Sequence, residues 1–445
     1  SWGGMINGLL TLRGAWDRVR ESVVLKFMVV AITAYGMATF EGPMLSLKSV
    51  NAISHFTDWT IAHVHIGGLG WNGMFTFGML YWLFPRLYRT ELYSKKMANQ
   101  HFWIATLGII LYAIPMYIAG FMQGLMWQEF KPDGTLANNF VDTVIEMKPF
   151  FYLRSIGGLL YLSGAILMFY NLVKTAKSGK LVANEETEAV VTKELHVNTK
   201  GEYWHKVIER KPIQFMILSL VIVAIGGIVE IIPTMIVKSN VPTIKSVKPY
   251  TPLELYGRDI YIREGCYNCH SQLIRPLRFE TVRYGAYSKS GEFVYDHPFQ
   301  WGSKRTGPDL AREGVKSGRL YKSNDWHFNH MLLPDSVSNG SIMPRYPWLL
   351  AKLDVTDTDK KIRAMQALGV PYAEGYDKKA VADLQAQAKE VAKPLYDNID
   401  ALLITDETFE KVKAGEMKFE EMEMVALIAY LQRLGTDIYP KKSEK

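Results

Sequence analysis

The chain has 445 residues, 48% of them hydrophobic, and a formal net charge of +7. Its Lys and Arg residues are interspersed with Asp and Glu and do not gather on one candidate recognition helix, so the charge excludes nucleic acid as the expected partner. Long apolar stretches fill the first 237 residues, whereas the remainder is polar and has no apolar run long enough to span a bilayer. We therefore expect a membrane region followed by a soluble domain.

Five segments have the length and polarity of helices that cross a lipid membrane, each near the roughly 20 residues that a hydrocarbon core requires. They are residues 22–40, 59–85, 102–125, 149–173 and 212–237. Lys and Arg are frequent in the connections 1–21, 86–101 and 174–211, which is typical of inside loops, and scarce in 42–58 and 126–148. This pattern predicts that the N-terminus lies inside and that everything after residue 238 lies outside.

The second of these segments carries a pair of histidines, His63 and His65, in the stretch TIAHVHIGGLG at 60–70. On a helix, residues two apart point roughly 200° apart and differ in height by about 3 Å. One helix could therefore hold two haem irons, one on each side, near the outside surface. A lone histidine in a membrane is more often a hydrogen-bonded structural residue, but a pair at the outer end of a predicted helix favours iron ligation in a chain that also carries the haem-attachment motif described next.

The soluble half contains the only two cysteines of the chain, in the stretch CYNCH at 266–270. This is the pattern of covalent c-type haem attachment, because Cys266 and Cys269 can each bond a vinyl group while His270 becomes the proximal ligand. A redox C-x-x-C pair is the alternative, but it does not need the following histidine. The predicted outside location agrees with haem c, since bacterial c-type cytochromes acquire their haem there.

The second axial ligand of a c-type haem usually comes from far along the chain and is often Met. Met343, in the stretch GSIMPRYP at 340–347, is the best candidate, and a packing role is its alternative. Nearby residues that could serve instead are Met331, His327 and His330. The closing segment 421–434 has the alternation of an amphipathic helix and should pack as a terminal helix.

Two long stretches of the chain resemble subunits of one family. The motifs TFEGPM (39–44), SHFTDWT (54–60) and HVH (63–65) resemble the catalytic subunit of cbb3-type cytochrome c oxidases, the C family of haem–copper oxidases, over about residues 5–175. From about 203 to 435 the chain resembles the membrane-anchored mono-haem cytochrome c subunit of that family. The motifs there are IE (208–209), GGIVE (226–230), CYNCHSQ (266–272), GPDL (307–310) and SIMP (341–344).

The resemblance implies a mainly α fold with five transmembrane helices. Residues 1–175 would be the last four helices of a twelve-helix oxidase bundle, and 176–211 a cytoplasmic linker between subunits that are usually separate chains. Residues 212–238 would form a membrane anchor, and 239–445 a class I-like cytochrome c domain in the periplasm. The protein would then lie in a bacterial inner membrane.

The resemblance also implies roles for individual side chains. His63 would ligate a high-spin, oxygen-binding haem b, and His65 a low-spin haem b. Glu41 matches a family glutamate that tunes the proximal ligand or moves protons, against the alternative of an exposed carboxylate at a helix end. Three residues are expected at haem propionates, each with an interfacial anchor as its alternative: His55, Trp59 and Arg154.

The implied activity is reduction of oxygen to water with proton translocation. Electrons would enter at one haem c from a soluble or membrane-bound cytochrome c and reach the two haems b. The copper ligands belong to eight helices that do not appear after Ser1, so we expect an upstream part, before Ser1 or in another chain, without which this segment is not an oxidase. Further cytochrome c subunits and a larger respiratory supercomplex are also expected partners.

Two other functions fit the same residues. A nitric oxide reductase of the same superfamily also pairs the helix bundle with an anchored mono-haem cytochrome c, and it would carry non-haem iron in place of copper. A membrane cytochrome that only relays electrons would have no haem able to bind carbon monoxide.

Overall fold

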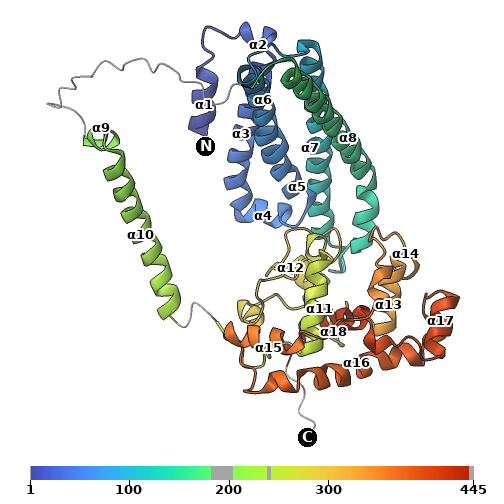
Figure 1. Ribbon diagram of the computed structural model, residues 1–445. Helices are drawn as coiled ribbons and strands as arrows, with labels where there is room; N and C mark the ends of the chain where they lie inside the picture. Colours follow the sequence, from blue (N-terminus) through green and yellow to red (C-terminus); the bar gives the residue numbers. More distant parts are fainter. Residues whose placement is uncertain (1, 182–203, 238–241, 440–445) are drawn as a thin grey trace.

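The chain is almost entirely helical. The computed structural model describes residues 2–181, 204–237 and 242–439, and over these ranges it contains isolated β-bridges but no β-strand. Figure 1 shows a bundle built from α1 to α8, a second helical domain built from α11 to α18 against one end of it, and a long helix, α10, that stands apart from both. The mainly α fold expected from the sequence is confirmed.

The first domain is a bundle of long helices around a short one. Its elements are α1 (Trp2–Leu10), α2 (Arg18–Glu21), α3 (Val23–Ser46), α4 (Lys48–Ser54), α5 (Asp58–His65), the π-helical segment η1 (Ile66–Gly73), α6 (Met74–Leu87), α7 (Lys95–Gln128) and α8 (Phe140–Ser178). Side-chain oxygens cap the first turns of three of these helices: Ser22 accepts from the backbone N–H of Leu25, Thr57 from that of Trp59 and Ser94 from that of Met97.

Among the described residues, four helices are long and apolar enough to cross a membrane: α3, α7, α8 and α10. They correspond to four of the five predicted spans, and α7 and α8 extend well beyond the predicted bounds. The remaining prediction, 59–85, falls on the continuous helical run of α5, η1 and α6, which the π-helical segment divides into shorter pieces. Its crossing of the membrane stays a prediction.

Much of the predicted outside connection 42–58 is helical, because α3 continues to Ser46 and α4 follows at once; its location outside the membrane stays a prediction. Polar residues mark the edge of the hydrocarbon region, but they do not by themselves end a helix. The end of the predicted span at residue 40 therefore marks a change in hydropathy and not the end of the helix.

Small residues let the helices of the bundle approach closely. A Cβ on Gly108 of α7 would lie 2.8 Å from the carbonyl oxygen of Gly157 on α8, and a Cβ on Gly120 would lie 1.9 Å from the backbone nitrogen of Trp59. Side chains larger than hydrogen would push these backbones apart. The two glycines of α7 thus allow it to pack against α8 on one side and against the start of α5 on the other.

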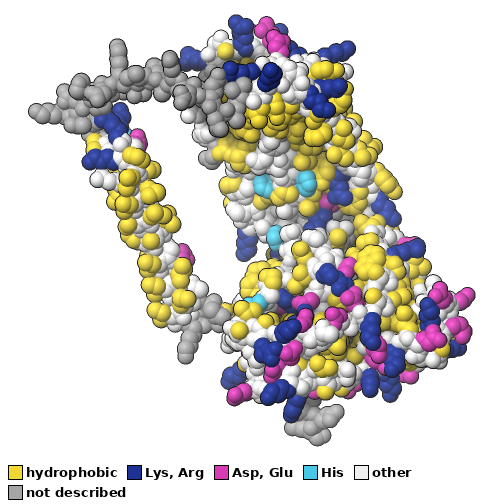
Figure 2. All heavy atoms as spheres, viewed as in Figure 1, with side chains coloured by type: hydrophobic (Ala, Val, Ile, Leu, Met, Phe, Trp, Pro, Cys, Tyr) yellow, Lys and Arg dark blue, Asp and Glu magenta, His cyan; other side chains and the backbone are white. Residues whose placement is uncertain are grey.

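The predicted anchor helix α10 (Pro212–Ile236) follows the short α9 (Trp204–Glu209). None of the residues in its most apolar stretch is buried, and Figure 2 shows hydrophobic side chains along its length. Such a surface suits contact with lipid. Most of the predicted linker, residues 182–203, lies outside the described residues.

The second domain packs around the crossing of its first and last helices. Its helices are α11 (Pro252–Arg263), α12 (Arg278–Tyr284), α13 (Asn324–Leu332), α14 (Pro334–Val337), α15 (Thr358–Ala367), α16 (Ala380–Asp397), α17 (Asp406–Lys413) and α18 (Glu423–Arg433), with short 3-10 turns between them. A Cβ on Gly257 of α11 would lie 1.9 Å from the carbonyl oxygen of Ala426 on α18. The predicted terminal helix is confirmed, and residues 424–431 are buried on every side instead of on one stripe.

Candidate haem sites

His63 and His65 lie in the last turn of α5 and have different partners. Nδ1 of His63 is 3.1 Å from Oε2 of Glu41, which comes from α3. Nδ1 of His65 is 2.7 Å from the backbone oxygen of Ile61, and Nε2 is 3.1 Å from the hydroxyl of Tyr112 on α7. In both rings a hydrogen bond from Nδ1 leaves Nε2 with the lone pair, which is the tautomer that can ligate a metal.

Glu41 is buried and is held by three side chains. It is 7% exposed, and besides His63 its carboxylate accepts the indole N–H of Trp59 at 2.6 Å and the hydroxyl of Tyr117 at 2.6 Å. The alternative of an exposed helix-end carboxylate is therefore wrong. A carboxylate bonded to the Nδ1 side of an imidazole orients the ring and raises its basicity toward a metal on the other nitrogen.

Three residues are expected at haem propionates. His55 and Trp59 lie near the start of α5, and Arg154 faces it from α8. The indole of Trp59 has a single N–H, which donates to Glu41. The guanidinium of Arg154 lies 4.0 Å from Oδ1 of Asp58 and 4.9 Å from the ring centroid of Phe151, and the ring of His55 packs 4.0 Å from that of Phe56. Contact with propionates stays a prediction for all three.

The second site is a cavity of about 270 Å³ in the helical domain. Cys266, Cys269, His270 and Met343 all line it, so the structure brings together the residues that the CYNCH motif and the Met loop contribute. The two cysteines are free thiols, and burial raises the pKa of Cys266 to about 12, which keeps it protonated. The left-handed backbone of Gly265 begins the short turn that carries both cysteines.

His270 is prepared to act as a haem ligand. Its Nδ1 lies 2.8 Å from the backbone oxygen of Pro308, and burial lowers its pKa, which favours the neutral imidazole. A Cβ on Gly307 would lie 2.2 Å from Cε1 of this ring, so only glycine allows the ring its place. Two thiols and one oriented imidazole around a single cavity fit a covalently bound haem c.

The candidates for the second axial ligand all line the same cavity: Met343, Met331, His327 and His330. Nε2 of His327 faces Oε1 of Glu313 at 3.6 Å. Met331 is 7% exposed and belongs to the hydrophobic core of the domain, whereas Met343 sits in an irregular loop and is only partly buried. Ligation by Met343 stays a prediction, and its loop position leaves the thioether the most freedom to reach an iron.

Part of the cavity wall comes from the other domain. Phe140, Val141 and Val144, at the start of α8, line the cavity together with the cysteines. Sequence reasoning missed this contact, and it also missed Tyr112, Tyr117, Asp58 and Gln123, which hold the histidines or their helix. A signal existed for Gln123, because an uncharged polar side chain within a predicted span needs a partner. Nothing local in the sequence points to α8 as part of the cavity.

Comparison with known families matches the two halves separately. The model described as "Cytochrome C oxidase, mono-heme subunit/FixO" matches residues 205–438. The model described as "Cytochrome C and Quinol oxidase polypeptide I" matches residues 1–160.

Curated relatives include oxidase subunits. The chain is 57% identical over 185 residues to cytochrome c oxidase subunit 1 of Rhodobacter capsulatus, covering 41% of this chain and 35% of that protein. It is 48% identical over 181 residues to the cbb3-type cytochrome c oxidase subunit CcoN1 of Stutzerimonas stutzeri, covering 40% and 38%. A nitric oxide reductase subunit from the same organism is 27% identical over 156 residues, covering 34% and 32%. The chain spans about a third of the length of these relatives.

Proposed function

Because the chain belongs to the family of mono-heme cytochrome c oxidase subunits and joins such a subunit to an oxidase polypeptide I region, we propose that it forms part of a cbb3-type respiratory terminal oxidase. Two subunit types would be fused in one chain. The higher identity to oxidase subunits than to the nitric oxide reductase subunit supports this choice over the reductase.

One observation carries the proposal: the cavity that holds Cys266, Cys269 and His270 is closed on one side by α8 of the other domain. A haem in this cavity would meet α8 of the domain that carries His63 and His65 on α5, and not only solvent. Such an arrangement serves electron transfer from the soluble domain into the membrane domain. When bound, one haem c and two haems b would supply electron transfer and oxygen binding, with copper held by an upstream part.

The protein residues would hold and orient these groups. Cys266 and Cys269 would form the thioethers, Pro308 would keep His270 oriented as an iron ligand, and Met343 would be the second ligand. Glu41 would orient His63 toward the oxygen-binding haem, and the carbonyl of Ile61 would orient His65 toward the low-spin haem. Proton uptake from the inside accompanies oxygen reduction in this proposal.

The distribution of Lys and Arg supports the orientation of the chain in a bacterial inner membrane. The N-terminus would be cytoplasmic, and the domain from α11 onward would lie in the periplasm, where a soluble or membrane-bound cytochrome c could donate electrons. Additional cytochrome c subunits and the upstream helices would complete the enzyme.

A reduced-minus-oxidised spectrum of the assembled complex, recorded with and without carbon monoxide and combined with metal analysis, tests the proposal. We expect one haem c, two haems b of which one binds carbon monoxide, and copper. A complex without a carbon monoxide signal would be an electron relay, and non-haem iron in place of copper would indicate a reductase.

A further inference from the structure

The two domains of the chain interlock at the turn between α4 and α5. The backbone N–H of Arg305 donates to the carbonyl of Phe56 at 2.9 Å, and Lys304 forms an isolated parallel bridge with the same residue. Phe56 is fully buried and has a φ of 69°, a left-handed conformation that is uncommon outside glycine. Such a conformation persists where its surroundings enforce it, and here those surroundings include the second domain.

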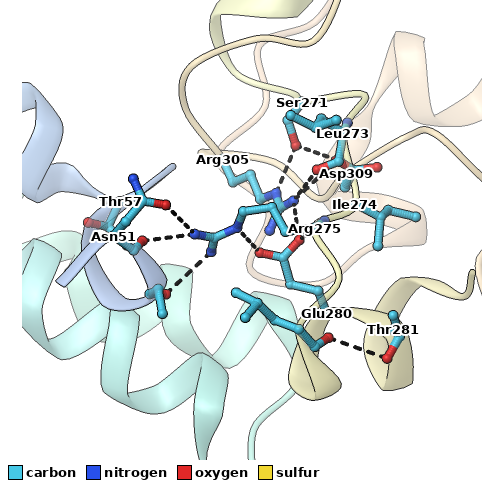
Figure 3. A network of polar contacts seen from close by, with 12 residues as sticks. Asn51, Thr57, Ser271, Leu273, Ile274, Arg275, Glu280, Thr281, Arg305 and Asp309 are labelled. Atoms are coloured by element: carbon cyan, nitrogen blue, oxygen red, sulfur yellow. Dashed lines mark hydrogen bonds and ion pairs between the residues drawn. The ribbon is translucent and has the colours of Figure 1, made fainter. Parts of the chain in front are cut away.

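Arginines of the second domain hold this turn from one side (Figure 3). Arg275 donates to the backbone oxygens of Asn51 at 2.8 Å and Ala52 at 3.3 Å, and so satisfies carbonyls in the last turn of α4. Glu280 is fully buried and forms ion pairs with both Arg275 and Arg305. The guanidinium of Arg305 lies 4.3 Å from the ring centroid of Phe56.

A buried ion pair holds the start of α5. Asp58, the first residue of that helix, is fully buried and pairs with Lys304, whose ammonium group is also buried. Its other carboxylate oxygen accepts from Nε2 of Gln123 at 2.7 Å, and Arg154 lies 4.0 Å away. A buried carboxylate needs such partners because burial removes its hydration. The second domain therefore supplies a cation that neutralises a charge inside the first.

The same short segment reaches the haem c site at its other end. Three residues after Lys304, the N–H of Gly307 donates to the carbonyl of Cys269 at 2.9 Å, and the carbonyl of Pro308 lies 2.8 Å from Nδ1 of His270. Residues 304–308 thus connect Asp58, five positions before His63, to the proximal histidine of the other site.

We propose that residues 304–308 form a positioning segment that locks the haem c site to helix α5, with the Lys304 and Asp58 pair as its anchor. The rate of electron transfer between haem c and the haems at His63 and His65 depends on this anchor. That rate falls steeply as the distance between the haems grows, and it also depends on their relative orientation. The inference rests on the proposed function and adds to it the residues that set the geometry between the two sites.

The test uses the assembled, haem-loaded oxidase with Lys304→Gln, Asp58→Asn and both changes together. Electron return to haem c after photolysis of carbon monoxide from the partly reduced enzyme measures the rate. We expect Lys304→Gln to slow it at least tenfold, with the haem content and the haem c potential unchanged, and the double variant to be no slower than the worse single one. Hydrogen exchange of residues 51–58 should become faster in the same variants.

Lys352→Gln is the matched control, since Lys352 pairs with Glu421 on the exposed surface of the same domain, and it should leave both measurements unchanged. Lys304→Arg keeps the charge and should retain most of the rate. This variant tests the inference if Lys304→Gln does not fold. Wild-type rate and wild-type exchange in Lys304→Gln, or equal losses in Lys352→Gln, would overturn the inference. A wild-type enzyme without any exchange of electrons between the c and b haems would instead overturn the proposed function.

Discussion

Oε2 of Glu41 lies 3.1 Å from Nδ1 of His63 and also accepts the hydroxyl of Tyr117 at 2.6 Å. One carboxylate oxygen on α3 therefore connects the candidate proximal ligand on α5 to a tyrosine on α7. A carboxylate that accepts from Nδ1 orients a metal-bound imidazole and strengthens it as a ligand.

We predict that Glu41→Gln lowers oxygen consumption by about 10- to 100-fold, which is typical when the partner of a metal-bound histidine is removed. The amide keeps the size of the side chain and loses its charge, so the vibration between iron and histidine in the oxygen-binding haem should shift to lower frequency. Glu91→Gln, at an exposed ion pair, is the control. Full activity with an unshifted vibration would mean that Glu41 only packs.

Substitution of each of the two histidines of α5 should have a different effect on the spectrum. His63→Ala should remove the carbon monoxide difference signal and oxygen consumption, whereas His65→Ala should remove a low-spin b band, because the rings have separate partners. Optical spectra of the two purified variants check this. Identical spectra for both variants would contradict two separate haems, and unchanged spectra would contradict haem ligation altogether.

The sequence predicted the helices, the histidine pair and the haem c motif because each depends on local chemistry. Periodicity and hydropathy report which residues avoid water, and the spacing of CYNCH is set by one porphyrin. These signals do not depend on how distant segments meet. The burial of Glu41 could not be predicted in this way, because it results from the packing of α3, α5 and α7 against one another.

The contacts between the two domains could not be predicted from residue patterns. Lys304 and Arg305 are charged residues in a loop, yet both are buried: Lys304 pairs with Asp58 of α5, and the backbone N–H of Arg305 donates to the carbonyl of Phe56. The π-helical segment after His65 was also missed, since its glycines are compatible with an α-helix in a membrane. Such features depend on tertiary contacts and not on local preference.

Gly307→Ala should prevent stable attachment of haem c. The added Cβ would lie 2.2 Å, 2.6 Å and 2.7 Å from three atoms of the His270 ring, and relieving such overpacking typically costs about 1–3 kcal/mol. We expect covalent haem, measured by mass spectrometry of the purified chain, to fall at least tenfold. Gly226→Ala is the control, because nothing lies within 4 Å of a Cβ there. Full haem content in Gly307→Ala would show that the ring can shift without consequence.

Met343→His should lower the midpoint potential of haem c by about 0.1 V or more, within the roughly 0.8 V over which axial ligands act. A thioether ligand raises the potential relative to imidazole. Met331→Leu should leave the potential nearly unchanged, since Met331 belongs to the hydrophobic core. The opposite pattern in a redox titration would identify Met331 as the ligand.

Glu313 should make the haem c potential depend on pH. Burial raises the pKa of this carboxyl to about 8, and Lys322 opposes the shift. Burial lowers the pKa of the neighbouring His327 to about 3 and that of His330 to about 4, so both imidazoles stay neutral where Glu313 titrates. These three residues and Lys322 line the haem c cavity.

The direction in which the haem c potential changes with pH follows from the charge on the iron. A ferric haem carries one more positive charge than a ferrous haem, so it favours the ionised carboxylate, and the pKa of Glu313 is lower in the oxidised protein. At a pH between the pKa of Glu313 in the oxidised protein and that in the reduced protein, reduction of the haem is accompanied by uptake of a proton. The potential therefore falls as pH rises, by at most about 59 mV per pH unit for one electron. Potentiometric titrations from about pH 6 to 9 should show this slope around the pKa of about 8 in the wild type and a flat line in Glu313→Gln. A wild-type potential that does not change over this range would mean that Glu313 keeps one protonation state in both oxidation states.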